Sequence, residues 1–168
     1  MLPFKKVLCP TDFSAPSCEA LSTAVEFAKA FSAPLVLVHV VQPIPAAASA
    51  SEFPIDVEAL EAALLREAER RLHELAHANV PKSVPTTVRA VRGSVAHEIL
   101  QVAQVEGADL IVISTHGETG FRHFLLGSVA ERIVRTAHCP VLTVRCSPPS
   151  GSAEVPRKES AVRSHRKL

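Results

Sequence analysis

Short apolar runs alternate along this chain with longer segments in which apolar residues recur every three or four positions. The run 35–41, which reads LVLVHVV, is apolar at almost every position and is typical of a strand buried on both faces. Strand and helix patterns in alternation favour a parallel sheet with right-handed crossovers and with helices on both faces. We expect strands at 4–9, 35–41, 84–91, 109–114 and 141–144, and helices at 14–31, 55–79, between Gly93 and Gly107, and at 128–137.

The expected helix 55–79 is long and amphipathic. Six apolar residues fall on one face at helical spacing, and we expect this face to cover the sheet. On another face, Glu67 and Arg71 are four residues apart, a spacing that allows an ion pair across one turn. The six apolar residues are Val57, Leu60, Leu64, Ala68, Leu72 and Leu75.

Charged residues divide the chain into two parts. The formal net charge is +1 at pH 7, but five basic and only two acidic residues follow Cys146. We therefore expect a mildly acidic folded domain at 1–146 and a basic, disordered tail at 147–168. A folded part of this sign lacks the concentrated basic face that nucleic-acid binding requires, so we expect no nucleic-acid partner. No apolar run approaches the roughly 20 residues of a membrane span, and we expect a cytoplasmic protein without a membrane partner.

Glycine is scarce in the chain except between Gly117 and Gly127. Three of the six glycines fall in this stretch. Glycine lets the backbone approach a phosphate group closely, and Gly127 and Ser128 stand at the expected start of a helix, where unpaired N–H groups attract anions. A simpler interpretation is also open, because Ser128 and Glu131 match a helix capping box. Taken alone, the loop fits phosphate binding and plain helix capping equally well.

Two common nucleotide-binding fingerprints are missing, since the chain has neither a P-loop nor a G-x-G-x-x-G sequence. The segment Ser114-x2-Gly117-x9-Gly127-Ser128 resembles instead the motif G-x2-G-x9-G-[ST] of the universal stress protein family, with Ser114 in place of the first glycine. The resemblance covers about residues 3–146. It also includes the stretches 10–14 (PTDFS), 38–40 (VHV) and 139–142 (CPVL).

The resemblance implies a three-layer α/β/α sandwich of the adenine nucleotide alpha hydrolase-like type, with five parallel strands in the order 3-2-1-4-5. It also implies that an adenine nucleotide binds as a regulatory ligand: ATP, or else AMP or ADP, with Mg²⁺. Adenine and ribose would lie beside Pro10, Thr11, Asp12 and Val40. The ligand would also contact the loop after the fourth strand, at Ser114, Thr115, His116, Gly117, Glu118, Thr119 and Gly120. A third contact would be the start of the last helix, at Gly127, Ser128, Val129 and Ala130.

A homodimer paired through the last strand, Val141–Arg145, is also implied by the resemblance, because an unpaired strand edge would otherwise invite aggregation. Two alternatives to a regulatory nucleotide site stay open. One is slow ATP hydrolysis or autophosphorylation on a residue such as Ser128, although the sequence offers no obvious base to activate water. The other is a nucleotide-free module that binds partners through its dimer surface or its basic tail.

Three histidines outside the expected site, together with His116 and Asp12 within it, are further candidate ligands. We expect His39, near the end of the second strand, to be packed or hydrogen-bonded rather than a ligand, and His116 to pack within its loop. His73 and His77 are four residues apart on a helix. Without a third ligand we expect them to form a solvated face rather than a metal site. Asp12 is the best candidate for a contact with Mg²⁺ or with the base and ribose.

Overall fold

The computed structural model describes residues 3–45, 56–115 and 126–145. Within these ranges, strands and helices alternate as the hydrophobic pattern predicts. The strands are β1 (Val7–Pro10), β2 (Leu35–Val41), β3 (Thr86–Arg92), β4 (Leu110–Ser114) and β5 (Val141–Val144), and the helices are α1 (Ala15–Phe31), α2 (Val57–Asn79), α3 (Val95–Glu106) and α4 (Ser128–Thr136).

All five strands form one parallel sheet in the order β3-β2-β1-β4-β5. The strand β1 lies at the centre, where Val7 is opposite Leu35 of β2 on one side and Leu110 of β4 on the other. The predicted strand order is therefore confirmed. Only β3 and β5 have an edge that pairs with no other strand of this sheet.

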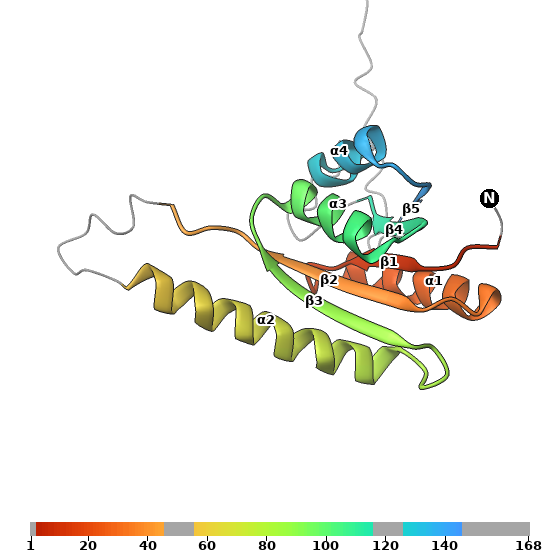
Figure 1. Ribbon diagram of the computed structural model, residues 1–168, viewed down its shortest axis with the longest axis horizontal. Helices are drawn as coiled ribbons and strands as arrows, with labels where there is room; N and C mark the ends of the chain where they lie inside the picture. Colours follow the sequence, from red (N-terminus) through yellow and green to blue (C-terminus); the bar gives the residue numbers. More distant parts are fainter. Residues whose placement is uncertain (1–2, 46–55, 116–125, 146–168) are drawn as a thin grey trace, which may run out of the picture.

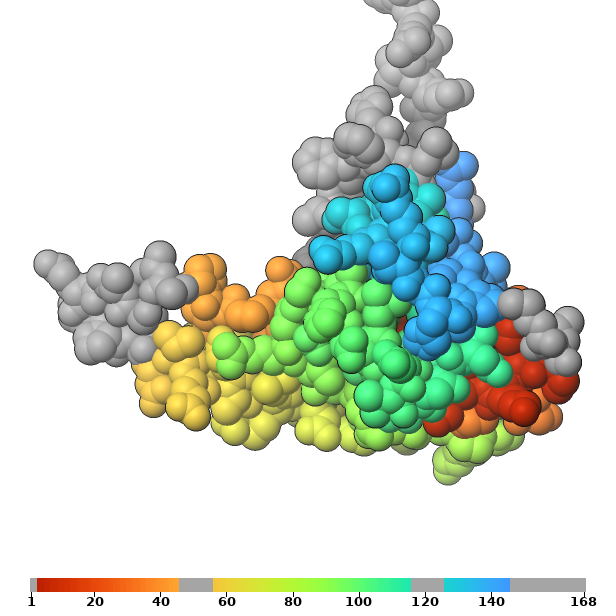
Figure 2. All heavy atoms as spheres, turned by 45° about the horizontal axis from the view of Figure 1, so that its top comes forward, coloured from red at the N-terminus to blue at the C-terminus, as the bar shows by residue number. Residues whose placement is uncertain are grey.

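Helices cover both faces of the sheet (Figure 1). α1 and α2 pack on one face, whereas α3 and α4 lie on the other, where Figure 2 shows them side by side. Successive residues of β1 point to opposite faces, so Val7 joins the core beneath α1 and Leu8 joins the core beneath α3. The predicted three-layer sandwich is confirmed. None of the helices in the described ranges is long and apolar enough to cross a membrane.

Three strands begin later than the sequence predicts, the fourth by a single residue, at Leu110. The backbone N–H groups of Lys5 and Lys6 donate to the carboxylate of Asp109, at 2.8 to 3.1 Å, and the first strand begins only at Val7. The third strand begins at Thr86, because the N–H of Val84 donates to the carbonyl of Pro81 at 2.9 Å and closes a turn there. The side chain of Asp109, just before β4, thus holds the backbone that precedes β1, whereas a local turn precedes β3.

The predicted apolar face of α2 is partly wrong. Ala68 and Leu72 are buried, but Leu60 and Leu64 are each 40% exposed. Glu61 is buried instead: its carboxylate forms an ion pair with Arg92 at 2.7 Å and accepts the backbone N–H of Ile44 at 3.1 Å. Figure 2 shows the start of α2, in yellow, beside the orange residues that follow β2. The side of α2 that faces the sheet is thus rotated away from its most apolar stripe.

Substituting two leucines of α2 tests this rotation. Leu72→Ala is expected to lower the free energy of unfolding by about 2 to 5 kcal/mol, because it removes a fully buried side chain and leaves a cavity. Leu60→Ala, an identical change at a site 40% exposed, is expected to cost less than about 1 kcal/mol. Urea denaturation of both variants measures the difference. Equal losses at the two positions would contradict the observed rotation.

Candidate functional site

A cavity of about 630 Å³ opens at the carboxyl ends of the central strands. Its walls come from the ends of β1, β2 and β4, from the starts of α3 and α4, and from one side of α2. The neighbouring strands β1 and β4 lead to helices on opposite faces of the sheet, α1 and α4. This is the switch point at which open parallel sheets bind their ligands.

Polar side chains hold the loop from β1 to α1. The hydroxyl of Thr11 lies 3.0 Å from that of Ser17 and accepts the backbone N–H of Phe13 at 3.0 Å. The carboxylate of Asp12 accepts the backbone N–H of Ser14 at 3.0 Å. Ser14 is the N-cap of α1, where its hydroxyl accepts the N–H of Ser17. The loop therefore presents Thr11 and Asp12 to the cavity in a hydrogen-bonded conformation.

His39 lines the cavity beside this loop. Its Nδ1 lies 2.8 Å from the carbonyl oxygen of Thr11, and with that nitrogen protonated the ring donates a hydrogen bond across the ends of two neighbouring strands. The centre of its ring is 4.5 Å from that of Phe13. The prediction of a packed, hydrogen-bonded histidine is confirmed.

α4 begins at the cavity without a side-chain cap. Gly127 is the N-cap residue, with an extended backbone (ψ 155°), and Ser128 is the first helical residue. The capping-box interpretation is therefore wrong, because Ser128 stands one position too late to cap the helix. The N–H of Gly127 donates to the carbonyl of Thr115 at 2.7 Å and ties the helix to the end of β4. First-turn N–H groups have no acceptor within a helix, so this end attracts anions.

α2 forms a wall of the cavity that the sequence did not predict. Glu67 pairs with Arg70 at 2.6 Å rather than with Arg71, so the predicted Glu67–Arg71 ion pair is wrong. The hydrogen bonds from Arg70, and to a smaller extent its charge, hold the pKa of Glu67 below its usual value. The guanidinium carbon of Arg71 lies instead 4.0 Å from the centre of the Phe13 ring. Arg71 therefore brings a positive charge to the cavity wall.

Most of the predicted binding residues that the structure describes are brought together in this cavity. Thr115 is buried next to it, and its N–H donates to the carbonyl of Val144 at 2.9 Å. The residues 116–120, namely His116, Gly117, Glu118, Thr119 and Gly120, lie outside the described residues. Those that line the cavity are Pro10, Thr11, Asp12, Val40, Ser114, Gly127, Ser128, Val129 and Ala130.

The sequence pattern did not predict the other residues that line the cavity. Val38, Val41 and Ile113 belong to strand ends, and the parallel topology was a signal that could have found them. The residues from α2 and α3 had no such signal, since their place depends on how each helix is rotated against the sheet. The remaining lining residues are Phe13, Ser17, His39, Gln42, Leu64, Glu67, Ala68, Arg71, Val95 and Ile99.

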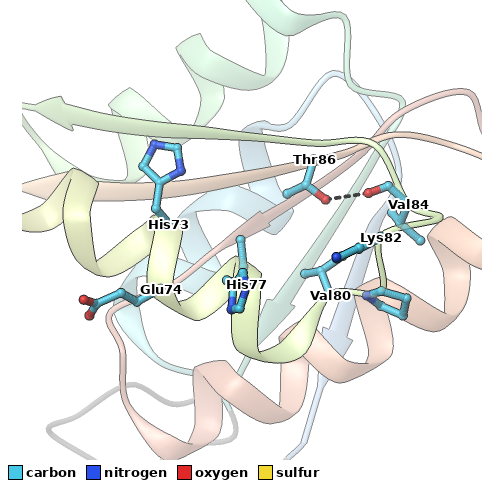
Figure 3. A pocket seen from close by; sticks show the side chains of 9 residues that line it. His73, Glu74, His77, Val80, Lys82, Val84 and Thr86 are labelled. Carbon is cyan, nitrogen blue, oxygen red and sulfur yellow. Dashed lines mark hydrogen bonds between the residues drawn. The ribbon is translucent and has the colours of Figure 1, made fainter.

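A second hollow, of about 600 Å³, lies between the end of α2 and the start of β3. It contains His73, Glu74 and His77, and Figure 3 shows the His73 ring and the Glu74 carboxylate pointing away from each other. Both histidines are exposed. Among the residues that the structure describes, no three His, Cys, Asp or Glu side chains are grouped to hold a metal ion. The exposure of both histidines agrees with the predicted solvated face.

The order of the strands and the cavity at the switch point define a doubly wound α/β protein. The uncapped start of α4 makes this cavity suited to an anionic group. The chain belongs to the universal stress protein family, whose model matches residues 3–145.

Individual relatives agree with this assignment. The chain is 37% identical over 142 residues to universal stress protein MJ0531 of Methanocaldococcus jannaschii, covering 84% of this chain and 82% of that protein. The structure of the hypothetical protein MJ0577 of the same organism superimposes with a TM-score of 0.74 and 30% identity over 86% of this chain and 97% of that chain. A universal stress protein in complex with cAMP superimposes with a TM-score of 0.59 and 26% identity, over 86% and 98% of the two chains. The fold is the adenine nucleotide alpha hydrolase-like fold of such proteins.

Two serines at helix starts are expected to differ in their effect on stability. Ser14→Ala removes the side-chain cap of α1 and is expected to lower the free energy of unfolding by about 1 kcal/mol. Ser128→Ala removes a hydroxyl that caps nothing and is expected to change that energy by less than about 0.5 kcal/mol. Chemical denaturation of the two variants without ligand makes the comparison. A loss at Ser128 as large as that at Ser14 would restore the capping interpretation.

Proposed function

We propose that this protein binds an adenine nucleotide, ATP first among them, as a regulatory ligand in the cytoplasm. The observation that carries the proposal is the cavity at the switch point, which is bounded at one end by the uncapped start of α4. A helix start of this kind suits a phosphate group. The similar structure that holds cAMP supports an adenine nucleotide as the ligand class.

The described residues suggest which part of the nucleotide would lie beside each wall of the cavity. Val40 is almost fully buried and offers an apolar surface to a base. Asp12 is exposed at the cavity and offers carboxylate oxygens to a ribose hydroxyl or to Mg²⁺. Because Mg²⁺ is commonly held by one carboxylate together with nucleotide phosphates, the carboxylate of Asp12 fits the ion. The backbone N–H groups of Ser128, Val129 and Ala130 would meet the phosphates.

A negative charge at the start of α4 separates phosphate binding from folding. Ser128→Asp is expected to weaken ATP binding by about tenfold or more, because a carboxylate there repels the phosphates. Its stability is expected to hold, since an acidic residue is favourable in the first turn of a helix. Adenosine, which has no phosphate, should bind the variant and the wild type with affinities within about threefold. Isothermal titration with ATP, ADP, AMP, cAMP and adenosine measures these affinities.

The matched control is Ser83→Asp, which adds the same charge to an exposed residue between α2 and β3. This residue lies at the amino ends of the strands, whereas the cavity lies at their carboxyl ends. It is expected to bind ATP as the wild type does. If the wild type takes up none of the five ligands at tens of micromolar protein, the proposal is wrong and a nucleotide-free module becomes the better interpretation. If Ser128→Asp weakened the binding of ATP and of adenosine equally, the phosphates would not lie at the start of α4.

We also propose that two copies of the chain pair through β5. This strand lies at an edge of the sheet, and all four of its residues keep intermediate exposure. The carbonyl of Pro140 accepts the N–H of Ile111 in β4 at 3.0 Å, and that of Val144 accepts the N–H of Thr115, directly after β4, at 2.9 Å. Alternate residues of a strand point their backbone groups to opposite sides, so Val141 and Thr143 direct theirs to the free edge.

Proline at position 143 tests this pairing. Thr143→Pro removes the N–H that faces the free edge and spares the hydrogen bonds to β4, so it is expected to yield a folded monomer where the wild type is a dimer. Sedimentation velocity gives the mass, and circular dichroism verifies the fold. The matched control is Thr86→Pro, which places proline in the other edge strand, β3, at a residue whose N–H also faces away from the neighbouring strand, and which is expected to stay dimeric. A dimeric Thr143→Pro protein would exclude β5 as the interface.

A further inference from the structure

Phe13 has an unusual backbone conformation. Its φ angle is 65°, in the left-handed region that residues with bulky side chains rarely adopt. It stands in the loop between β1 and α1, directly after Asp12, and lines the cavity. A strained conformation persists only when the surrounding contacts outweigh its cost, and such residues gather at binding sites. The contacts that hold Phe13 therefore matter for the site.

Three contacts hold Phe13, and they come from three elements. Its backbone N–H donates to the hydroxyl of Thr11 at 3.0 Å, within the loop. Its ring lies 4.5 Å from the ring of His39 at the end of β2. The third contact comes from α2, where the guanidinium carbon of Arg71 lies 4.0 Å from the ring centre. A cation at this distance over an aromatic face is attracted by the negative face of the ring.

Nearby acidic residues form their ion pairs with Arg70 and not with Arg71, although the charge of Arg71 also helps to lower the pKa of Glu67. Glu67 and Glu74, four residues before and three after it, both form ion pairs with Arg70. Arg71 forms no ion pair within the part of the chain that the structure describes. Its charge is thus directed to Phe13 at the cavity, while the charge of its neighbour is engaged on the exposed side of the helix.

We propose that Arg71 is a positioning residue of the nucleotide site, which acts by holding Phe13, and with it the loop that carries Thr11 and Asp12, in the conformation that binds the ligand. This inference rests on the proposed function. The contact joins α2 to the loop before the ligand arrives. Without it the loop samples other conformations, and binding must then include the cost of ordering it.

Three variants isolate the contact. Arg71→Met removes the charge but keeps a long apolar side chain, Phe13→Leu removes the ring, and Arg66→Met is the control, because Arg66 is exposed on the same helix and holds neither Glu67 nor Glu74. Loss of a cation–π contact corresponds to a roughly 2- to 30-fold change in an equilibrium constant. We expect Arg71→Met and Phe13→Leu each to weaken ATP binding within this range in isothermal titration, and Arg66→Met to change it by less than about twofold. Arg71→Lys is expected to restore part of the loss.

The double variant separates positioning from direct contact with the ligand. If Arg71 acts through Phe13, the combination of Arg71→Met with Phe13→Leu binds ATP no more weakly than Phe13→Leu alone. Losses that add in full would show that Arg71 touches the ligand itself, and would overturn the inference. An unchanged affinity in Arg71→Met would overturn it as well.

Hydrogen exchange without nucleotide gives a readout that does not depend on binding. The amides of Phe13 and Ser14 are expected to exchange about fivefold faster, or more, in Arg71→Met than in the wild type, as the loop opens more often. Arg66→Met is expected to leave their exchange unchanged. A wild type that binds no nucleotide would disprove the proposed function, and the exchange rates would still report whether Arg71 holds the loop. Unchanged exchange in Arg71→Met would overturn the positioning role.

Discussion

Parallel pairing of β1 between β2 and β4 is the constraint on which the site depends. Because the three strands run in one direction, their carboxyl ends meet at one edge, and the chain must turn there toward helices on either face. Hydrogen bonds between neighbouring strands continue for one residue past the ends of β1 and β4. The N–H of Thr11 donates to the carbonyl of Val38, and the N–H of Thr115 donates to the carbonyl of Val144, both at 2.9 Å. Beyond these residues, side chains such as Asp12 and Ser14 take over as partners of the backbone.

Helices α1 and α4 satisfy their first turns differently at this edge. Ser14 caps α1 with its own hydroxyl, whereas Gly127 has no side chain to offer to α4. The uncapped N–H groups of α4 are therefore open to an acceptor from outside the helix. This difference gives the cavity one end that favours negative charge, and it is the physical reason to expect phosphates beside α4 rather than beside α1.

Most of the sheet was predictable from the sequence, and part of the cavity was not. Strands buried on both faces read as continuous apolar runs, so β2 and β4 were evident, and the topology then placed Asp12 and Ser114 at one edge. The wall formed by α2 escaped prediction for a different reason. Periodicity shows which side of a helix is apolar, but the direction of that side in the fold depends on distant partners, such as Arg92 for Glu61.

The buried carboxylate of Glu61 explains why α2 turns Arg71 toward the cavity. Successive helical residues are about 100° apart, so Glu61, Ala68 and Leu72 share the side that faces the sheet, and Leu64 and Arg71 lie together on its flank. If α2 were rotated by one residue, the charge of Glu61 would lose its partner Arg92, and a buried charge without a partner is strongly unfavourable. The ion pair need not add much stability to select this one rotation. It thereby links the end of β3 to the contact between Arg71 and Phe13.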